Sequence, residues 1–453
     1  MSMDWNQLLC AERLGRESKP RPHDPARSEF WRDSDRLTFS TAFRRLQDKT
    51  QVFPLADNDY VRTRLTHSLE VASVGRSLGV RVGALITQRH RLARHGLEFG
   101  EIVAAAGLAH DLGNPPFGHS GEDAIRHWFQ TSPVAAEAGA NLGTAQRADI
   151  ERYEGNAQGF RLITRLQARD NPGGMQLTYA TLGAFTKYPR ESIVPGEIHH
   201  GASAKKFGFY QSEREYFAIV AEHCGLLRRT PDAAWWARHP LAFLVEAADD
   251  ICYRLVDFED GVRTGHLRYS QVRKAFLALI PANQHPRRLH EAYDDTRRVQ
   301  ILRAVAIGAA IDEATEVFMA RESEILAGRF DQPLIEAVPS RAVWEQIMRR
   351  SRKTIYNTTR GVEIEAAGFA VIGGLLDDFV TALNDLAARG KHTAARSQKL
   401  LGLVPAQYLA PKRTAPRDPY VRLLNMLDFV SGMTDTYAVA LYRKIRGISL
   451  SGR

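Results

Sequence analysis

Hydrophobic residues recur at intervals of three and four positions along most of this chain. Clear runs contain Val71, Val74 and Leu78, then Ile102, Val103, Ala106 and Leu108, and later Ile301, Val305, Ala309, Ile311 and Val317. This spacing places apolar side chains on one face of an α-helix. Alternation with period two is scarce, and residues 206–210 are its best example. The pattern therefore predicts an all-α fold with at most a small β-hairpin.

Breaks rich in proline or glycine interrupt the helical pattern at residues 19–25, 171–174, 188–195 and 404–419. We interpret them as loops within one large helical body. The predicted parts are residues 1–60, an N-terminal segment that packs on the core; residues 61–265, the core itself; and residues 266–453, a C-terminal helical region that completes the same body.

Composition narrows the class of protein. The chain has no run of about eighteen uninterrupted apolar residues, so no membrane span is expected. Its first residues are polar where a secretory signal needs an apolar centre. Cys10, Cys224 and Cys252 lack CxxC spacing, which argues against a disulfide framework or a thiolate zinc site and favours a reducing cytoplasm.

The formal net charge of +9 favours polyanionic partners, such as nucleotide phosphates or a nucleic-acid backbone. Basic residues gather loosely at positions 13–27, 349–353 and 412–417, and no polybasic tail dominates. A solvated, mildly basic surface accounts for the charge equally well. The charge alone leaves both interpretations open.

Potential metal ligands follow one another in a distinctive order: His67, the pair His110 and Asp111, and Asp249. Two imidazoles and two carboxylates suit Mn, Fe, Ni, Co or Zn better than Ca or Mg, which prefer all-oxygen sites. The pair would end a buried helix that begins near Glu101 and is closed by residues 113–116. A hydrogen-bonded core pair is the alternative for the dipeptide alone, but the ordered partners favour the signature of an HD-type metal-dependent phosphohydrolase.

The segment after Pro240 predicts a helix that carries Asp249, Tyr253 and Asp257 one above another, at intervals of four residues. Asp250 would point elsewhere. The three stacked side chains could hold a metal, a sugar and a sugar hydroxyl in succession. A solvated acidic stripe with an aromatic neighbour is the alternative interpretation.

His119 and Glu122 lie one helical turn apart, so the carboxylate could orient the imidazole. An imidazole beside a bound phosphate can act as a general base or a general acid. A capping arrangement at a helix start is the alternative, because Ser120 is followed by acidic residues. We favour the catalytic interpretation.

Several motifs together resemble one known family. They are FRRLQDKTQVFP, TRLTHSLEV, HDLGNPPFGHSGE, EGNAQGFR, TLGAFTKYP, EAADDICY and SGMTDTYA. The resemblance as a whole runs from about Phe30 to Tyr437, which is nearly the whole chain. The set resembles the bacterial deoxyguanosine triphosphate triphosphohydrolase family, with the mammalian SAM-and-HD-domain dNTP hydrolase as a more distant relative. The resemblance implies an HD-domain helical core with additional C-terminal helices. It also implies hydrolysis of a dNTP, dGTP among them, to deoxynucleoside and inorganic triphosphate.

The resemblance further implies roles for individual residues. The metal ligands would be His67, His110, Asp111 and Asp249, and the catalytic pair His119 and Glu122. The substrate would meet Arg64 and Lys187 at the triphosphate, Tyr188, Tyr253 and Asp257 around the sugar and base, Gln51 and Asn156 on the nucleoside side, and Lys206 or its neighbour Lys205 at a phosphate. Asn114 departs from the pattern, because many relatives have a histidine there, which puts in doubt any role for a third histidine at the phosphates.

The resemblance and the basic charge together predict the cofactor and partners. The cofactor would be a divalent ion: Mn, Mg or another transition ion. The chain would form a homo-oligomer, with a hexamer favoured, and would bind single-stranded DNA weakly.

Two other functions remain possible on the sequence. An HD enzyme that hydrolyses cyclic nucleotides or guanosine tetraphosphate would keep the metal site without needing TKYP or SGMTDTYA. A nucleic-acid-binding protein with a vestigial HD site would keep the basic surface and tolerate the loss of His119 or Glu122. The presence of all these features favours dNTP hydrolysis.

Overall fold

The computed structural model describes residues 2–16, 27–51, 62–196, 201–287, 289–356 and 359–448. Within these residues nineteen α-helices are joined by loops and short 3₁₀ and π turns, and isolated β-bridges occur without a sheet. The predicted all-α class is confirmed. The N-terminal proline-rich break at residues 19–25 lies outside the described residues.

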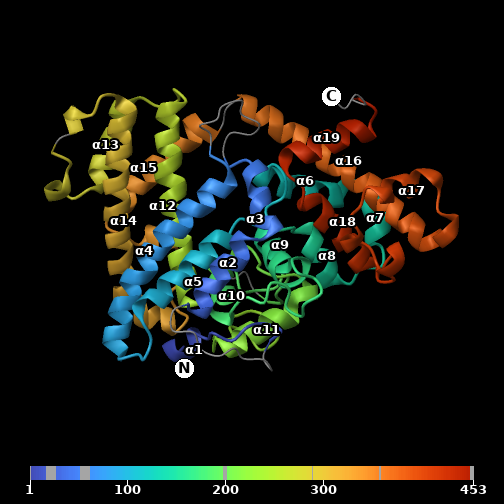
Figure 1. Ribbon diagram of the computed structural model, residues 1–453, viewed down its shortest axis with the longest axis horizontal. Coiled ribbons are helices and arrows are strands. Elements are labelled where there is room, and N and C mark those ends of the chain that lie inside the picture. Colours follow the sequence, from blue (N-terminus) through green and yellow to red (C-terminus); the bar gives the residue numbers. More distant parts are fainter. Residues whose placement is uncertain are drawn as a thin grey trace.

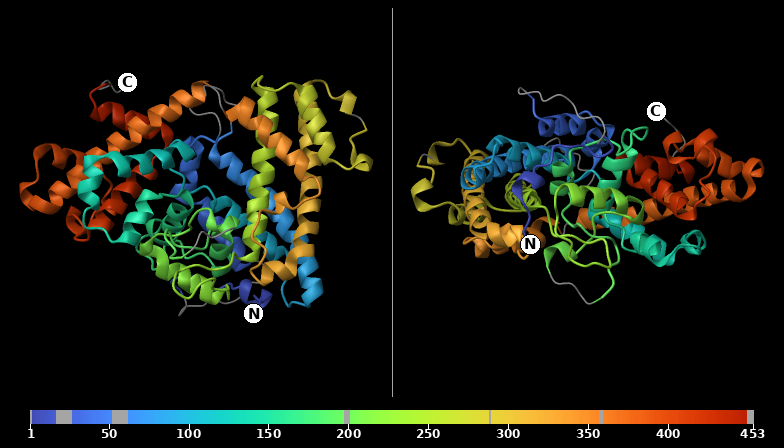
Figure 2. Two further views of the ribbon diagram at one scale, coloured as in Figure 1. Left: turned by 180° about the vertical axis from the view of Figure 1, so that it is seen from behind. Right: turned by 90° about the horizontal axis from the view of Figure 1, so that it is seen from below.

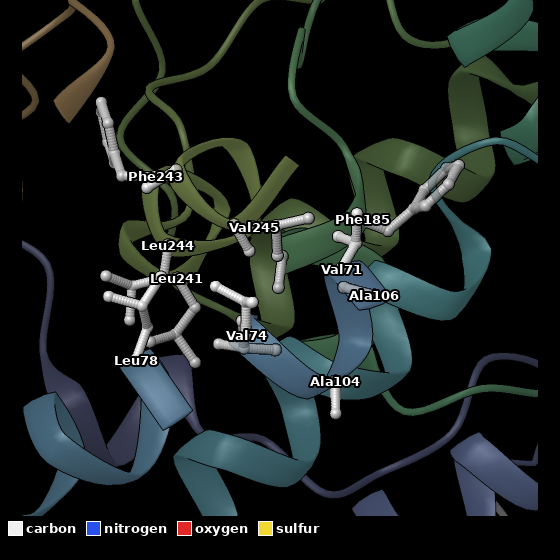
Figure 3. Close-up of a cluster of buried hydrophobic side chains, with 14 of the residues drawn as sticks. Val71, Val74, Leu78, Ala104, Ala106, Phe185, Leu241, Phe243, Leu244 and Val245 are labelled. Carbon is white, nitrogen blue, oxygen red and sulfur yellow. The ribbon is translucent and has the colours of Figure 1, made fainter. Parts of the chain in front are cut away.

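A first group of helices surrounds one hydrophobic cluster. This group contains α1 (Trp5–Leu8), α2 (Glu29–Thr38), α3 (Thr41–Arg45), α4 (Arg64–His90), α5 (Gly96–Ala109), α10 (Tyr179–Phe185), α11 (Arg214–His223), α12 (Pro240–Arg263), α13 (Tyr269–Leu279), α14 (Asp295–Leu326) and α15 (Arg341–Ser351). Figure 3 shows part of the cluster, where Val71, Val74 and Leu78 of α4 lie near Leu241, Leu244 and Val245 of α12.

A second group surrounds a second hydrophobic cluster. Its helices are α6 (Gly118–Thr131), α7 (Pro133–Gly139), α8 (Thr144–Glu151), α9 (Gly155–Arg161), α16 (Thr359–Arg389), α17 (Ala395–Gly402), α18 (Pro419–Ser431) and α19 (Asp435–Ile445). Helices α13, α14 and α15 stand at one end of the molecule and α17 and α18 at the other (Figures 1 and 2). The described N-terminal residues contribute Met3 to Leu46 of the first cluster, and the division at residues 60 and 265 stays a prediction.

The hairpin candidate at residues 206–210 is a loop rather than a strand pair. Its alternating aromatic side chains are all buried, but they face different clusters: Phe209 lies in the first, and Phe207 and Tyr210 lie in the second. The alternation therefore arises because this segment passes between the first and the second hydrophobic cluster.

Helices α4 and α5 form an antiparallel hairpin that positions the candidate site. Gly79 of α4 lies against α5, and a Cβ atom added there would come within 2.7 Å of the Gly100 Cα atom. This close approach lets the start of α4 meet the end of α5, as in other αα-hairpins. Helix α5 begins at Gly96, earlier than the predicted Glu101, because the His95 side chain caps it by accepting a hydrogen bond from the Leu97 N–H.

One helical stretch in the described residues, Gly361–His392, is long and apolar enough to cross a membrane by length and composition alone. It consists of most of α16 and the 3₁₀ turn that follows it, Gly390–His392. More than half of its most apolar window is buried inside the protein. Its buried residues, including Ile372, Leu376 and Phe379, form the centre of the second cluster. This placement is typical of a core helix.

Candidate metal centre and active site

Three helices bring the predicted metal ligands together. His67 projects from the first turn of α4, which is capped by the Thr63 N–H donating to Thr66 Oγ1 at 3.2 Å. Asp249 lies on α12, and its Oδ1 is 3.1 Å from His67 Nε2 and 3.7 Å from His110 Nε2. His110 Nε2 is also 3.6 Å from Asp111 Oδ1. Residues far apart in sequence thus form one compact cluster.

The ring of His110 is oriented by the end of its own helix. Its Nδ1 lies 2.7 Å from the Gly107 carbonyl oxygen. Because a carbonyl only accepts, Nδ1 carries a proton, and in the neutral ring Nε2 is then the nitrogen with a lone pair for a metal ion. A backbone partner of this kind commonly fixes the tautomer of a metal-binding histidine.

Asp111 is held by two donors beside the cluster. Arg64 Nη1 donates to Oδ2 at 2.7 Å, and Asn114 Nδ2 donates to Oδ1 at 2.5 Å. Burial alone would raise the pKa of Asp111, but Arg64 and then the two histidines hold it at about 2. Asn114, the departure from the family pattern, therefore orients a predicted ligand.

The two neighbouring aspartates of α12 have different partners. Burial opposes ionisation of Asp249, yet His110 and His67 hold its pKa well below the usual range. Asp250 instead forms an ion pair with Arg254 at 3.0 Å, and burial raises its pKa to about 6. Asp249 faces the two histidines, whereas Asp250, which was predicted to point elsewhere, lines the same cavity while paired with Arg254.

The donor set fits a divalent ion. His67, His110 and Asp111 each offer a ligand atom within 4.8 Å of the others. Ligands bound at about 2.1 Å to one ion are spaced roughly 3.0–3.5 Å apart, and the separations of 3.1, 3.6 and 3.7 Å are close to that range. Nitrogen and carboxylate donors in equal number favour transition ions.

The segment that follows the cluster packs on the EGNAQGFR motif. A Cβ atom at Gly113 would collide with the Gly155 carbonyl, and one at Gly155 would lie 2.7 Å from Glu122 Oε1. The glycines therefore allow the segment after Asp111 and the side chain of Glu122 to approach the start of α9 closely. Glu122 is buried as a result, and its Oε1 accepts the Gly155 N–H at 2.8 Å.

His119 contacts the other carboxylate oxygen of Glu122, the one that does not bind the Gly155 N–H. Its Nδ1 lies 3.0 Å from Glu122 Oε2, so the carboxylate accepts the Nδ1 proton. The His119 side chain is 77% exposed, which leaves Nε2 accessible from the cavity described below. The predicted pair is therefore brought together in the structure.

A second buried carboxylate, Glu154, lies beside this pair. Lys206 Nζ is 3.0 Å from Glu154 Oε1 and 3.9 Å from Glu122 Oε2, and Asn156 Nδ2 donates to Glu154 Oε1 at 2.7 Å. Burial raises the pKa of Glu154, and the nearby Glu122 raises it further. Lys206 and Asn156, predicted to face substrate, here contact a glutamate that the sequence reasoning did not single out.

A cavity of about 450 Å³ opens over the cluster. Among the predicted residues its walls include Gln51, Arg64, His67, Asp111, His119, Asp249 and Tyr253. Gln51 Oε1 is buried and has no hydrogen-bond partner among the described residues, so a polar atom is left for a ligand to satisfy. The volume lies in the range of small-molecule sites.

The far end of the cavity is aromatic. The rings of Tyr253 and Tyr356 stack with centroids 5.4 Å apart, and Tyr356 donates to Asp257 Oδ2 at 2.9 Å. Burial raises the pKa of Asp257 to about 7. Tyr356 was not predicted, although Met348, Arg352 and Tyr356 all line the cavity at the same four-residue spacing that identified Asp249, Tyr253 and Asp257.

Lys187 and Tyr188 are not among the residues that line the cavity, although the charge of Lys187 interacts with that of Asp249. Lys187 Nζ pairs with Glu246 at 3.1 Å and stands 5.7 Å from the centre of the Tyr188 ring. Burial opposes the charge on Lys187, but Glu246 raises its pKa above the usual value. Glu246, one turn before Asp249, was also missed by the sequence reasoning.

The late SGMTDTYA motif, residues 431–438, contacts segments that form the site, but none of its residues lines the cavity. Asp435 accepts the backbone N–H of Thr50 and of Phe117, each at 3.0 Å. Lys49 Nζ donates to the carbonyl oxygens of Asn114 and Ser431. The motif thereby ties the segment before Gln51 to the segment before His119.

Comparison with known proteins agrees with this geometry. The family model described as HD domain matches residues 64–152, which include His67, His110 and Asp111. A deoxyguanosinetriphosphate triphosphohydrolase-like protein of Synechocystis is 45% identical over 99% of this chain and 100% of its own. A protein of the same name from Pseudomonas aeruginosa is 41% identical, over 99% of both chains. The deoxyguanosinetriphosphate triphosphohydrolase of Yersinia enterocolitica is 30% identical, over 98% of this chain and 99% of its own.

Proposed function

The chain belongs to the deoxyguanosinetriphosphate triphosphohydrolase family, and on that premise we propose that it is a metal-dependent dNTP triphosphohydrolase. It converts a dNTP, dGTP among them, and water to deoxynucleoside and inorganic triphosphate. The observation that carries the proposal is the cluster of His67, His110, Asp111 and Asp249, of which His67, Asp111 and Asp249 line a nucleotide-sized cavity together with His119.

The four ligands would hold a divalent ion: Mg, or Mn or another transition ion. When bound, such an ion neutralises phosphate charge and lowers the pKa of a bound water. Arg64 supports the same end of the cavity, because its guanidinium pairs with Asp111 and lines the wall. Lys187 adds a second cation beside Asp249. Together these cations offset the charge of about −4 on the substrate and stabilise the transition state.

His119 moves a proton during the displacement at the α-phosphorus. Glu122 holds the proton on Nδ1 and stabilises the cationic ring, so Nε2 exchanges protons with the attacking water or with the leaving 5′-oxygen. Lys206, which pairs with Glu154, also lies near Glu122 and helps to hold it in position.

The nucleoside occupies the aromatic end of the cavity. Tyr253 with Tyr356 covers the sugar, and Asp257 accepts a hydrogen bond in the same array. A tyrosine ring packed over the C2′ position would collide with a ribose hydroxyl, which gives preference for deoxynucleotides. Gln51, Asn156 and Tyr188 complete the nucleoside side of the site.

A substrate panel tests the proposal. The four dNTPs, the four NTPs, a cyclic nucleotide and guanosine tetraphosphate are incubated separately with the protein and Mn²⁺, and the products are separated by ion-exchange chromatography. We expect deoxynucleoside and triphosphate from at least one dNTP, no reaction with NTPs, and loss of activity after chelation. Hydrolysis of a cyclic nucleotide or of guanosine tetraphosphate in place of every dNTP would reject the proposal.

We also propose a cytoplasmic homo-oligomer, with a hexamer favoured, that binds single-stranded DNA weakly. The net charge of +9 supports this, because subunit repetition joins diffuse basic patches into one surface. The free state of Cys10, Cys224 and Cys252 suits a reducing compartment. Light scattering measures the mass, and titration of a labelled oligonucleotide at two salt concentrations measures the binding. A monomer, or salt-independent affinity, would reject this part alone.

A further inference from the structure

A separate cavity of about 1020 Å³ lies between α13 and α15, away from the metal ligands. Its walls come from the turn after α12, from α13, from α15 and from the π turn η8 (Arg352–Tyr356). Figure 1 shows α13 and α15 side by side at one end of the molecule. None of its described lining residues is an aspartate or a glutamate.

The cavity wall carries a cluster of uncompensated cations, which we call the basic groove. Its members are Arg268, Lys274, Arg349, Arg350 and Lys353. No ion pair joins any of the five to a carboxylate within the described part of the chain. Two arginines outside the groove differ in this respect, because Arg254 pairs with Asp250 and Arg303 with Glu259.

Cations gathered without counter-charges repel one another, so a bound anion would relieve their repulsion. Guanidinium and ammonium groups are the usual protein partners of phosphate oxygens. Five of them along one groove match an anion with several phosphates better than a single phosphate. The groove floor is aliphatic, from side chains such as Leu267 and Ile347, and among the described lining residues no Phe, Tyr or Trp ring is exposed. The imidazole of His266 is the one exposed ring among those residues, so base stacking, which proteins use to hold single-stranded nucleic acid, has little platform there.

We propose that the basic groove is a binding site for a small inorganic polyphosphate of the triphosphate class. This choice of ligand rests on the proposed function, because the proposed reaction releases that anion. The groove itself rests only on the arrangement of the five cations.

The same segment forms a wall of both cavities. Arg349, Arg350 and Lys353 line the basic groove, whereas Met348, Arg352 and Tyr356 line the candidate active site. Residues on one face of α15 and η8 therefore line the basic groove, and residues on another face line the candidate active site. An anion in the groove contacts the turn that holds Tyr356 against Tyr253.

Isothermal titration with sodium tripolyphosphate tests the proposal on the full chain. The test variant is Arg350→Ala with Lys353→Ala, and the matched control is Lys391→Ala with Lys399→Ala, two exposed lysines on another surface. We expect wild type and control to bind at the groove in addition to the active site, and the test variant to lose that additional equivalent or to bind it at least tenfold more weakly. Thermal denaturation confirms that each variant is folded.

Equal stoichiometry and affinity in wild type and test variant would overturn the proposal. The proposal also fails if the two substitutions weaken binding of an oligonucleotide and leave tripolyphosphate binding unchanged, because the groove would then be a nucleic-acid surface. The substrate panel is read separately. Groove binding without dNTP hydrolysis would reject the proposed function and retain the anion site. Hydrolysis of a dNTP without groove binding would retain the proposed function and reject the anion site.

Discussion

Replacing Glu122 with glutamine tests the proposed proton-transfer pair most sharply. Glutamine keeps an oxygen for the Gly155 N–H but places an amide N–H₂ group opposite His119 Nδ1, where two donors would face each other. A hydrogen bond to a charged group contributes about 1.5–3 kcal/mol. Since about 1.36 kcal/mol corresponds to a tenfold change in rate, turnover should fall roughly 10- to 150-fold.

The assay compares kcat, KM and metal content of the variant with those of Asp123→Asn. Asp123 is on the same turn of α6, is 60% exposed and pairs only with Arg126 in the described structure, so its loss should change turnover by less than about threefold. Metal content of the Glu122 variant should match wild type. Loss of the metal, or unchanged turnover in the Glu122→Gln variant, would refute the assigned role.

Three further expectations follow from particular contacts. Asp249→Ala should remove the bound metal measured by elemental analysis, whereas Asp250→Ala should retain it; the opposite result would contradict the helix register. Tyr253→Ala should reduce discrimination between a dNTP and its NTP, measured as the ratio of kcat/KM values, by about tenfold or more; an unchanged ratio would place the sugar elsewhere. Burial raises the pKa of Asp149 to about 7 despite hydrogen bonds from Ser192 and Tyr420. Because this folded-state pKa lies above the unfolded value, the contribution of Asp149 to stability is full below about pH 4 and is lost as the pH rises through 7. The melting temperature of wild type should therefore fall between pH 5.5 and 8 relative to that of Asp149→Asn. If the melting temperatures of the two proteins changed in parallel with pH, the raised pKa of Asp149 would be contradicted.

The local part of the site was predictable from sequence because it depends on helical spacing. The four-residue intervals from Asp249 through Tyr253 to Asp257 and the three-residue interval from His119 to Glu122 specify faces of single helices. The proline at the start of α12 was recognisable for the same reason. The helical class follows from the same periodicity of apolar residues.

The parts that sequence missed depend on contacts between distant segments. Tyr356 reaches Asp257 across 99 positions in the chain, and Lys206 reaches Glu154 across 52. No spacing rule connects such residues, since their meeting depends on how whole helices pack. The buried partners Glu154 and Glu246 were missed because an isolated glutamate carries no periodic signal.

The most direct test of the central claim is hydrolysis of a dNTP in water enriched in ¹⁸O, with products identified by phosphorus NMR and mass spectrometry. Attack of water at the α-phosphorus predicts one ¹⁸O atom in intact inorganic triphosphate and none in the deoxynucleoside. Pyrophosphate with a deoxynucleoside monophosphate, orthophosphate with a diphosphate, or ¹⁸O in the deoxynucleoside would contradict it.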